Sequence, residues 1–280
     1  MQIKVKTPAK INLTLEITGK RPDGFHKIRS VMQMINLYDI LTININRQDR
    51  FKINLSGNNT NIPYDDKNIV YKAIVAFTDY THLKDYRFDI YIDKHIFTEA
   101  GLAGGSSNAA GTLLALNELF ETSLTSEELH KIASTLGSDL NVILMGGCTL
   151  AEGRGEKVTP VTFREYPVSL IKPNNLGISA KEGYQKYSSL KDKPQNNYTD
   201  KVINALKNNE DIKPFLYNDL ETAVFKDYNI LQKIKSKNPK SIMSGSGSTY
   251  FVLDNTINNV ENCTVVNGLK TINTGCDFIE

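Results

Sequence analysis

The chain has 280 residues, of which 40% are hydrophobic and 23% charged, so it is long enough for two lobes and its composition excludes wholesale disorder. Lys and Arg number 33 against 31 Asp and Glu, a net charge of +2 with no dense basic stripe, and nucleic acid is therefore not an expected partner. Cys148, Cys263 and Cys276 are odd in number and far apart, which argues against a disulfide framework and favours a reducing, cytoplasmic location. No apolar run approaches the roughly 18–20 residues that span a bilayer, and the first six residues alternate like a strand, so we expect neither a membrane partner nor a targeting segment.

Alternating apolar and polar residues predict strands through the first hundred residues. An alternation over 3–17 reaches the turn at 19–24 and predicts a hairpin. A second pair of strands, joined by a polar turn, is predicted over 39–55. Helical apolar spacing over 68–77 and a further alternation over 86–92 then place a helix and a strand before the first glycine cluster.

The glycine-rich segment 101–108 precedes a helix whose apolar face runs from 109 to 120, and its serine hydroxyls are placed to cap the first free amides. Thr125–Glu128 forms a capping box for the next helix, which ends near Gly137 and places Asp139 in the following turn. Strands and turns follow, and the pattern restarts near residue 160.

A soft boundary near residue 157 divides the chain into an N-terminal domain, 1–156, and a C-terminal domain, 157–280. In the second domain a polar loop is predicted over 188–200, followed by helices over 199–207 and 216–234. A Gly/Ser segment, 244–248, leads into a strand over 250–253.

The segment 101–108 combines a permissive backbone with a helix start, so its exposed N–H groups and the helix dipole favour an anion, and phosphate is the natural ligand. Taken alone, such a run is a tight strand-to-helix turn without a ligand about as often as it is an anion site. It lacks the spacing of a P-loop, and the chain contains neither HRD nor DFG, which excludes a Walker A site and a protein kinase. A second small-residue loop at 244–248, by itself a hairpin loop, suggests a cleft in which two loops surround phosphates.

Two charged residues are candidates for chemistry. Asp139 can accept a hydroxyl proton, although an aspartate in a turn is the commoner reading of its position. Lys10 lies in a strand-like segment, where a lysine is ordinarily solvated. The histidines show no metal-ligand spacing, so we expect no metal site built from protein ligands.

Three segments, Pro8–Leu13, Gly101–Ala110 and Met243–Ser248, resemble in order the three motifs of the GHMP small-molecule kinases. The resemblance extends over the whole chain. It implies a two-lobed α+β fold with an N-terminal ATP-binding lobe, a C-terminal lobe and an active site in the cleft between them.

Within that superfamily, Gly19–His26, Leu136–Asp139 and Gly153–Glu156 resemble the members that act on 4-diphosphocytidyl-2-C-methyl-D-erythritol in non-mevalonate isoprenoid synthesis. The resemblance implies transfer of the γ-phosphoryl group of ATP to the 2-hydroxyl of this cytidyl diphosphate sugar alcohol, with Mg²⁺ accompanying the nucleotide. By similarity, Asp139 orients or deprotonates the hydroxyl, and Lys10 lowers the pKa of that hydroxyl and neutralises charge on the phosphoryl oxygens.

The same resemblance assigns the binding residues. Asn12 helps to hold the substrate, Phe25 and Tyr184 sandwich the cytosine, and His26 reads its edge. The residues carried over for ATP are Asn68 and Lys94, toward the adenosine, and Gly101, Gly104, Gly105, Ser106 and Ser107 in the glycine loop.

The chain departs from the family pattern beside these motifs. Phe97 stands where proline is usual and Ala103 where a third glycine is usual, Leu140–Asn141 replaces Val-Pro, and Ala180 replaces a threonine. Two alternatives to the cytidyl kinase therefore stay open: a GHMP kinase for another small alcohol, or a nucleotide-binding protein of this fold without turnover.

Overall fold

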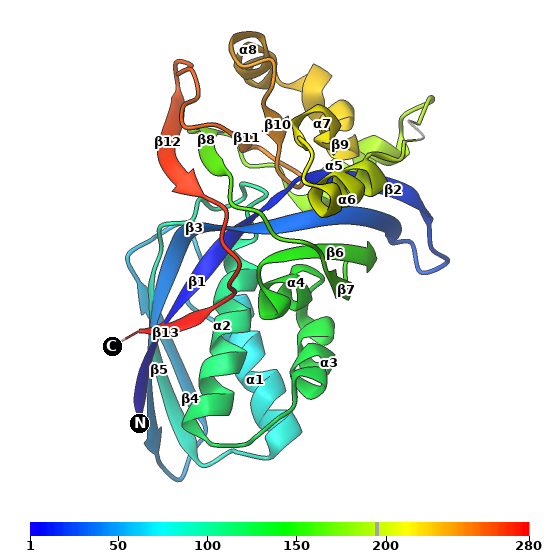
Figure 1. Ribbon diagram of the computed structural model, residues 1–280. Coiled ribbons are helices and arrows are strands. Elements are labelled where there is room, and N and C mark those ends of the chain that lie inside the picture. Colours follow the sequence, from blue (N-terminus) through cyan, green and yellow to red (C-terminus); the bar gives the residue numbers. More distant parts are fainter. Residues whose placement is uncertain (194–195, 280) are drawn as a thin grey trace.

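The structure, a computed structural model, describes residues 1–193 and 196–279 (Figure 1). Residues 194–195 of the expected polar loop, and residue 280 at the end of the expected second domain, lie outside the described residues. Helices and strands are mixed along the whole chain, in agreement with the expected α+β class.

The larger sheet is built mainly from the first part of the chain and has β3 near its middle. β3 pairs antiparallel with β1, β2, β5 and β6 along its length, and the hairpin predicted at 19–24 joins β2 to β3. The strands of this sheet are β1 (Gln2–Asn12), β2 (Thr14–Lys20), β3 (His26–Arg47), β4 (Lys52–Gly57), β5 (Tyr86–Asp93), β6 (Cys148–Gly153), β7 (Lys157–Pro160), β9 (Tyr217–Asn218) and β13 (Asp277–Ile279).

One predicted pairing is wrong. The strands expected over 39–55 exist as the end of β3 and as β4, but they do not pair with each other. β5 lies between them, antiparallel to β3 and parallel to β4. The alternation of β5 shows that the face with Phe88, Ile90 and Ile92 is buried, but it does not show which strands pair with the two edges of β5.

Four helices, α1 (Ile69–Thr81), α2 (Gly104–Leu119), α3 (Ser126–Leu136) and α4 (Asp139–Met145), pack beside the larger sheet (Figure 1). Asn68 caps α1, and the predicted capping box of α3 is confirmed because Thr125 and Glu128 exchange both hydrogen bonds. The sequence predicts that Asp139 lies in a turn, but in the structure Asp139 is the first residue of α4. A carboxylate is favoured there by the free amides and the dipole of the helix.

The smaller sheet has the order β10-β11-β8-β12 and carries the second group of helices. Its strands are β8 (Pro167–Pro173), β10 (Ile242–Met243), β11 (Tyr250–Val252) and β12 (Cys263–Lys270); the helices are α5 (Ala180–Ser188), α6 (Tyr198–Asn208), α7 (Asp219–Val224) and α8 (Asn229–Lys237), with 3₁₀ turns at Lys213–Phe215 and Phe225–Asp227. The single helix expected over 216–234 is thus divided into α7 and α8. Tyr228, with extended backbone between them, interrupts the helical hydrogen bonds.

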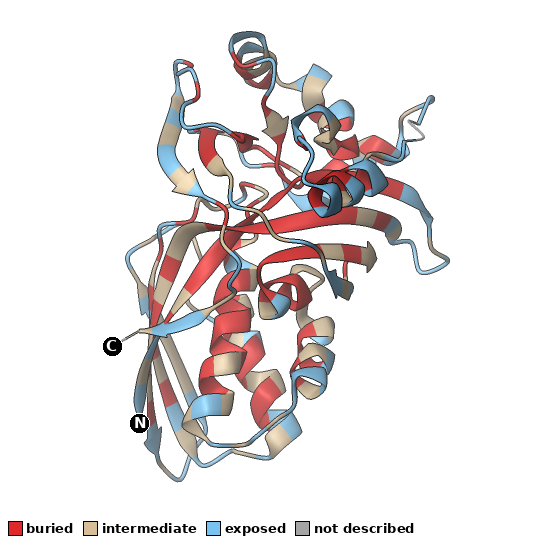
Figure 2. Cartoon of the chain, in the orientation of Figure 1, coloured by how far each residue is buried: buried red, intermediate tan, exposed pale blue. Residues whose placement is uncertain are grey.

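Buried residues lie along the strands of both sheets (Figure 2). One apolar cluster joins Leu15 and Met32 of the larger sheet to Val142 of α4 and to Ile171 and Tyr250 of the smaller sheet. The chain also returns to the larger sheet after residue 157, since β7 pairs with β6, β9 with β2 and β13 with β1. The division at residue 157 stays a prediction. In the described part of the chain, no helix has the length and apolar character needed to cross a membrane.

Candidate active site

A cleft of about 1440 Å³ lies between the two groups of elements. Its walls come from the β2–β3 hairpin, the glycine loop before α2, the start of α4, α5 and the loop after β10. It brings together all the predicted site residues except Ser107: Lys10, Asn12, Phe25, His26, Asn68, Lys94, Gly101, Gly104, Gly105, Ser106, Asp139 and Tyr184.

Lys10 and Asp139 face each other in this cleft. The side chain of Lys10 is buried, and its Nζ donates to Asn12 Oδ1 at 2.7 Å and lies 3.8 Å from Asp139 Oδ2. Burial lowers the pKa of Lys10, while the carboxylate of Asp139 acts in the opposite direction. Asn12 is itself fixed, because its Nδ2 donates to Ser30 Oγ at 2.9 Å. The site therefore holds a cation, a carboxylate and an amide in one connected group.

A bulge in the sheet accompanies the position of Lys10. The register between β1 and β3 shifts between Pro8 and Ala9, immediately before the lysine. Bulges redirect the side chains that follow them and are frequent beside active sites. Proline fits this place because it has no N–H to donate to the ladder.

The two small-residue loops meet at Gly101. Its carbonyl oxygen accepts hydrogen bonds from Lys10 Nζ at 3.0 Å and from Ser244 Oγ at 2.9 Å. Gly101 has φ +73°, and a Cβ at this position would lie 1.9 Å from the carbonyl oxygen of Ser244, so the close approach requires glycine. Asn218 holds the second loop from behind by donating to the carbonyl oxygens of Met243 and Gly245 at 2.6 and 2.8 Å.

The glycine loop presents the start of α2 to the cleft. Gly104, Gly105 and Ser106 line it, and the first amides of an α-helix have no partners within the helix, so this end suits an anion. The expected capping by serine hydroxyls is wrong: the N-cap residue is Ala103, without a side-chain cap. Ser107 is fully buried, and its hydroxyl donates to the carbonyl oxygen of Pro8.

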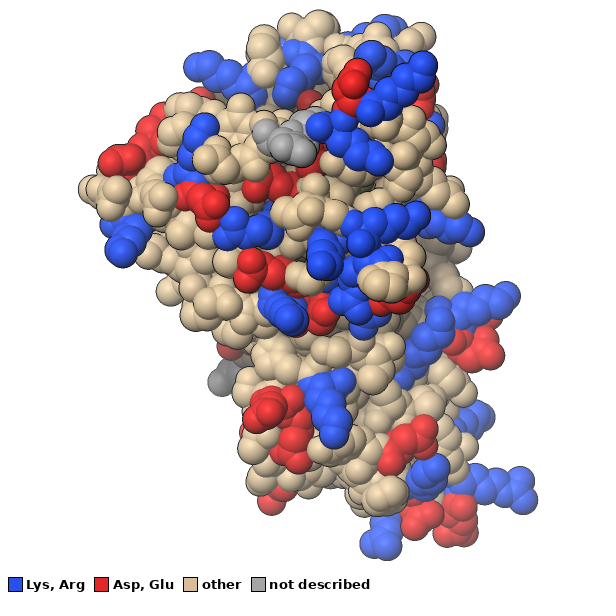
Figure 3. Space-filling model, turned by 90° about the vertical axis from the view of Figure 1, so that its right-hand side faces the viewer, with Lys and Arg blue, Asp and Glu red and all other residues tan. Residues whose placement is uncertain are grey.

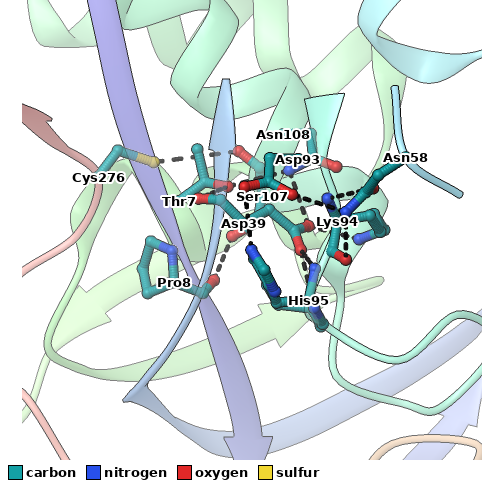
Figure 4. Close-up of polar contacts among 11 residues, drawn as sticks. Thr7, Pro8, Asp39, Asn58, Asp93, Lys94, His95, Ser107, Asn108 and Cys276 are labelled. Carbon is teal, nitrogen blue, oxygen red and sulfur yellow. Dashed lines mark hydrogen bonds and ion pairs between the residues drawn. The ribbon is translucent and has the colours of Figure 1, made fainter. Parts of the chain in front are cut away.

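A buried carboxylate lies beneath this loop (Figure 4). Asp39 is 0% exposed and accepts hydrogen bonds from the backbone amides of His95 and Ile96 at 2.7 and 2.8 Å and from Asn108 Nδ2 at 2.9 Å. It also forms an ion pair with Lys94 Nζ. The ammonium of Lys94, assigned by resemblance to the adenosine, is thus directed at Asp39. Asp39 is not among the residues predicted from the sequence, although an acidic residue inside an otherwise alternating apolar strand is a signal of a special role.

Asn68, the other residue assigned to the adenosine, has a structural task as well. Its Oδ1 accepts a hydrogen bond from the amide of Val70 at 2.9 Å, and its Nδ2 donates to the carbonyl oxygen of Pro63 at 2.6 Å. It lines the cleft at the same time. A cap of this kind fixes both the start of α1 and the loop before it.

The aromatic residues gather at the other end of the cleft. The rings of His26 and Tyr184 are stacked with centroids 5.1 Å apart, and Ser188 Oγ lies 3.0 Å from His26 Nε2. Phe25 is 54% exposed, and the guanidinium carbon of Arg154 lies 5.6 Å from the centroid of its ring. Partial burial, with Lys20 and Lys193 nearby, lowers the pKa of His26, which favours the neutral imidazole.

Basic side chains dominate the described lining of the cleft. Seven lysines and arginines line it, against two carboxylates, Glu99 and Asp139. Such an excess of positive charge favours phosphate-bearing ligands. Only Lys10 and Lys94 among these cations are predicted site residues. Lys172, one of the other five, is buried, and its Nζ donates to the carbonyl oxygens of Pro173 and Leu176 at 2.8 and 2.6 Å. In Figure 3, basic side chains gather across the middle of one face of the molecule with acidic side chains between them.

Known proteins resemble this chain over most of its length. The profile of the GHMP kinases N terminal domain matches residues 68–147. A 4-diphosphocytidyl-2-C-methyl-D-erythritol kinase of Clostridium tetani is 37% identical over 270 residues, which cover 93% of this chain and 94% of the relative. The kinase of the same name from Clostridium novyi is 39% identical over 251 residues, or 87% of this chain and 88% of the relative.

Solved structures agree with these relatives. A crystal structure of 4-(cytidine 5'-diphospho)-2C-methyl-D-erythritol kinase superposes with a TM-score of 0.73 at 28% identity and covers 90% of each chain. A homoserine kinase from Cytophaga hutchinsonii has a TM-score of 0.75 at 15% identity over 99% of this chain and 97% of its own, which shows the fold alone. The chain belongs to the family of 4-diphosphocytidyl-2-C-methyl-D-erythritol kinases, within the GHMP kinases.

Proposed function

We propose that this protein transfers the γ-phosphoryl group of ATP to the 2-hydroxyl of 4-diphosphocytidyl-2-C-methyl-D-erythritol, giving the 2-phosphate and ADP. The relatives that cover about nine-tenths of the chain carry the name of this kinase. The observation that carries the proposal is the joining of Lys10, Asp139 and the glycine loop in one cleft that also contains Phe25, His26 and Tyr184. One end of this cleft suits phosphates and the other suits a planar base.

In the proposed reaction, Asp139 accepts the proton of the 2-hydroxyl, and the hydroxyl oxygen attacks the γ-phosphorus. Lys10, 3.8 Å from Asp139, neutralises negative charge that develops on the transferred group. Asn12, bonded to Lys10 Nζ, holds the substrate beside both groups. Positioning and electrostatic stabilisation supply most of the rate in phosphoryl transfer, because little covalent chemistry is asked of the protein.

The phosphates of ATP bind the amides at the start of α2, and the second loop, 244–248, closes the same space from the other lobe. Mg²⁺, if bound with the nucleotide, would neutralise charge on the β- and γ-phosphates. Glu99 and Asp139 are carboxylates on the wall of the cleft, the donor type that Mg²⁺ accepts besides phosphate and water. At the base end, Phe25 and Tyr184 enclose the cytosine, and neutral His26 reads its edge.

The test is conversion of the substrate by the purified protein. We would incubate it with ATP, Mg²⁺ and 4-diphosphocytidyl-2-C-methyl-D-erythritol, and follow ADP release together with the new phosphomonoester signal by phosphorus NMR. Asp139→Asn should lower turnover by about 10²–10⁴-fold, because it removes the base but keeps the size of the side chain. Absence of conversion by the wild type would overturn the proposal, and full turnover by Asp139→Asn would overturn the role of this residue.

A further inference from the structure

The proposed phosphoryl transfer gives no task to one motif of the sequence, the turn of residues 153–156 between β6 and β7. Its Arg154 lines the cleft, whereas the side chain of Glu156 is 21% exposed and lies outside the lining. The turn makes polar contacts with three other parts of the molecule: the β2–β3 hairpin, α3 and α4. A short turn with bonds in three directions is well placed to fix these parts relative to one another.

The carboxylate of Glu156 is enclosed by its own turn and reaches the hairpin. Its Oε2 accepts a hydrogen bond from the amide of Arg154 at 2.6 Å. A Cβ at Gly153, which has φ +73°, would lie 2.6 Å from the same oxygen, so the turn leaves room for the carboxylate only with glycine there. The other oxygen, Oε1, accepts a hydrogen bond from Arg21 Nη1 at 3.3 Å.

On the hairpin, Arg21 continues this chain of contacts to the aromatic residue. Its Nε donates to Asp23 Oδ2 at 3.0 Å, and Asp23 Oδ1 accepts a hydrogen bond from the amide of Phe25 at 3.2 Å. The amide of Arg21 donates to the carbonyl oxygen of Phe25 at 2.7 Å, which closes the loop. Glu156 thereby holds the segment from which Phe25 projects.

Arg154 acts on the ring of Phe25 directly. Its guanidinium carbon lies 5.6 Å from the ring centroid, and its Nη2 donates to the carbonyl oxygen of Ser134 on α3 at 2.7 Å. The second contact fixes the guanidinium, so the cation supports an aromatic side chain that is more than half exposed.

The opposite side of the turn is attached to the helix that begins with Asp139. Asn141, buried in the first turn of α4, donates from Nδ2 to the carbonyl oxygen of Glu156 at 2.9 Å. A Cβ on Gly155 would lie 3.1 Å from Cβ of Ser138, so the turn packs closely beside the residue that precedes Asp139. The turn therefore contacts both ends of the substrate site.

We propose that the turn 153–156 fixes the distance between Phe25 and Asp139, and that Glu156 and Arg154 are positioning residues for the base end of the substrate. This inference rests on the proposed function, in which the cytosine and the reacting hydroxyl belong to one substrate molecule. A molecule that is held at both ends reacts only when the two ends of the site are correctly spaced.

Glu156→Gln is the main test, with Glu152→Gln as the matched control. Glu152 is in β6, next to the turn, and also pairs with an arginine, Arg29, at 3.1 Å. We expect Glu156→Gln to raise KM for the cytidyl substrate by about tenfold, with KM for ATP and the unfolding midpoint unchanged, because a charge-assisted contact to the hairpin is lost. Hydrogen exchange of amides 21–25 should become faster. Glu152→Gln should change neither KM for the cytidyl substrate nor the exchange of amides 21–25.

Arg21→Gln removes the same contact from the hairpin side and serves if Glu156→Gln does not fold. When both are combined, KM should rise no further than in Arg21→Gln alone, because Glu156 acts on the hairpin through Arg21, which also contacts Asp23. Unchanged KM and unchanged exchange in both variants, or an equal effect of Glu152→Gln, would overturn the inference. If the wild type does not convert the cytidyl substrate, the proposed function fails, and the exchange of amides 21–25 alone decides whether the turn holds the hairpin.

Discussion

In the proposed function the cleft has a phosphate end at the glycine loop and a base end at Phe25, His26 and Tyr184. A carboxylate supports each end, Asp39 at the phosphate end and Glu156 at the base end, and only Asp39 is buried. Asp39, under the glycine loop, is 0% exposed and has Lys94, Asn108 and two backbone amides as partners. Glu156, beside the base end, is 21% exposed and pairs with an arginine whose side chain is 32% exposed. A carboxylate therefore supports the phosphate end from a buried position and the base end from a partly exposed one.

The difference in exposure predicts a difference in what each carboxylate controls. Removal of one member of a buried ion pair leaves the other charge without solvent or partner, so the cost falls on the folded state. At a partly exposed pair, water replaces the lost partner and screens the charge, so the cost to folding is small. We therefore expect changes at the phosphate end to act on stability and changes at the base end to act on binding.

The largest effect should come from Asp39→Asn. It leaves the ammonium of Lys94 buried without a counter-charge, and breaking a buried pair in this way costs about 3–5 kcal/mol of unfolding free energy. Urea denaturation measures it as a lowered midpoint with an unchanged slope. The control is Asp79→Asn, which breaks an exposed pair with Lys84 and should leave the midpoint unchanged. Equal midpoints for the two variants would mean that the buried pair at the phosphate end stabilises the fold no more than an exposed pair does.

Phe25→Ala should show the opposite pattern. The ring is 54% exposed, so its removal should leave the unfolding midpoint close to that of the wild type. Stacking of an aromatic ring on a base is worth about 1–3 kcal/mol, so KM for the cytidyl substrate should rise roughly tenfold or more while kcat stays the same. Steady-state kinetics with each substrate varied in turn separate these quantities. A KM for the cytidyl substrate within error of the wild type would contradict the stacking role of Phe25.

Much of the fold followed from local patterns, because alternation, caps and glycine positions act over a few residues. The helix at 69–81, the capping box at Thr125 and the β2–β3 hairpin are of this kind. The insertion of β5 between β3 and β4, and the contact of Gly101 with Ser244, depend on residues far apart in the chain, which periodicity does not relate. The site residues were assigned by resemblance to known motifs. Asp39 and Glu156 act through other residues, and only the fold reveals what they hold.

Ala103 offers a smaller and more local test of the phosphate end. It precedes α2 with φ +57° and ψ +26°, a left-handed conformation that glycine adopts without the strain that a Cβ introduces. Ala103→Gly should relieve this strain, but it also gives the unfolded chain more freedom, so we expect a net gain of about 0.5–1 kcal/mol in unfolding free energy.

The matched control is the same substitution twelve positions later in the chain, Ala115→Gly, at a fully buried place inside α2. There the helix gains no relief of strain and loses both helix propensity and a buried methyl group, so the unfolding free energy should fall by at least about 1 kcal/mol. The two variants should therefore shift the urea midpoint in opposite directions. A fall of similar size in both would mean that the backbone conformation of Ala103 carries no strain, and that alanine suits the phosphate loop as well as glycine does.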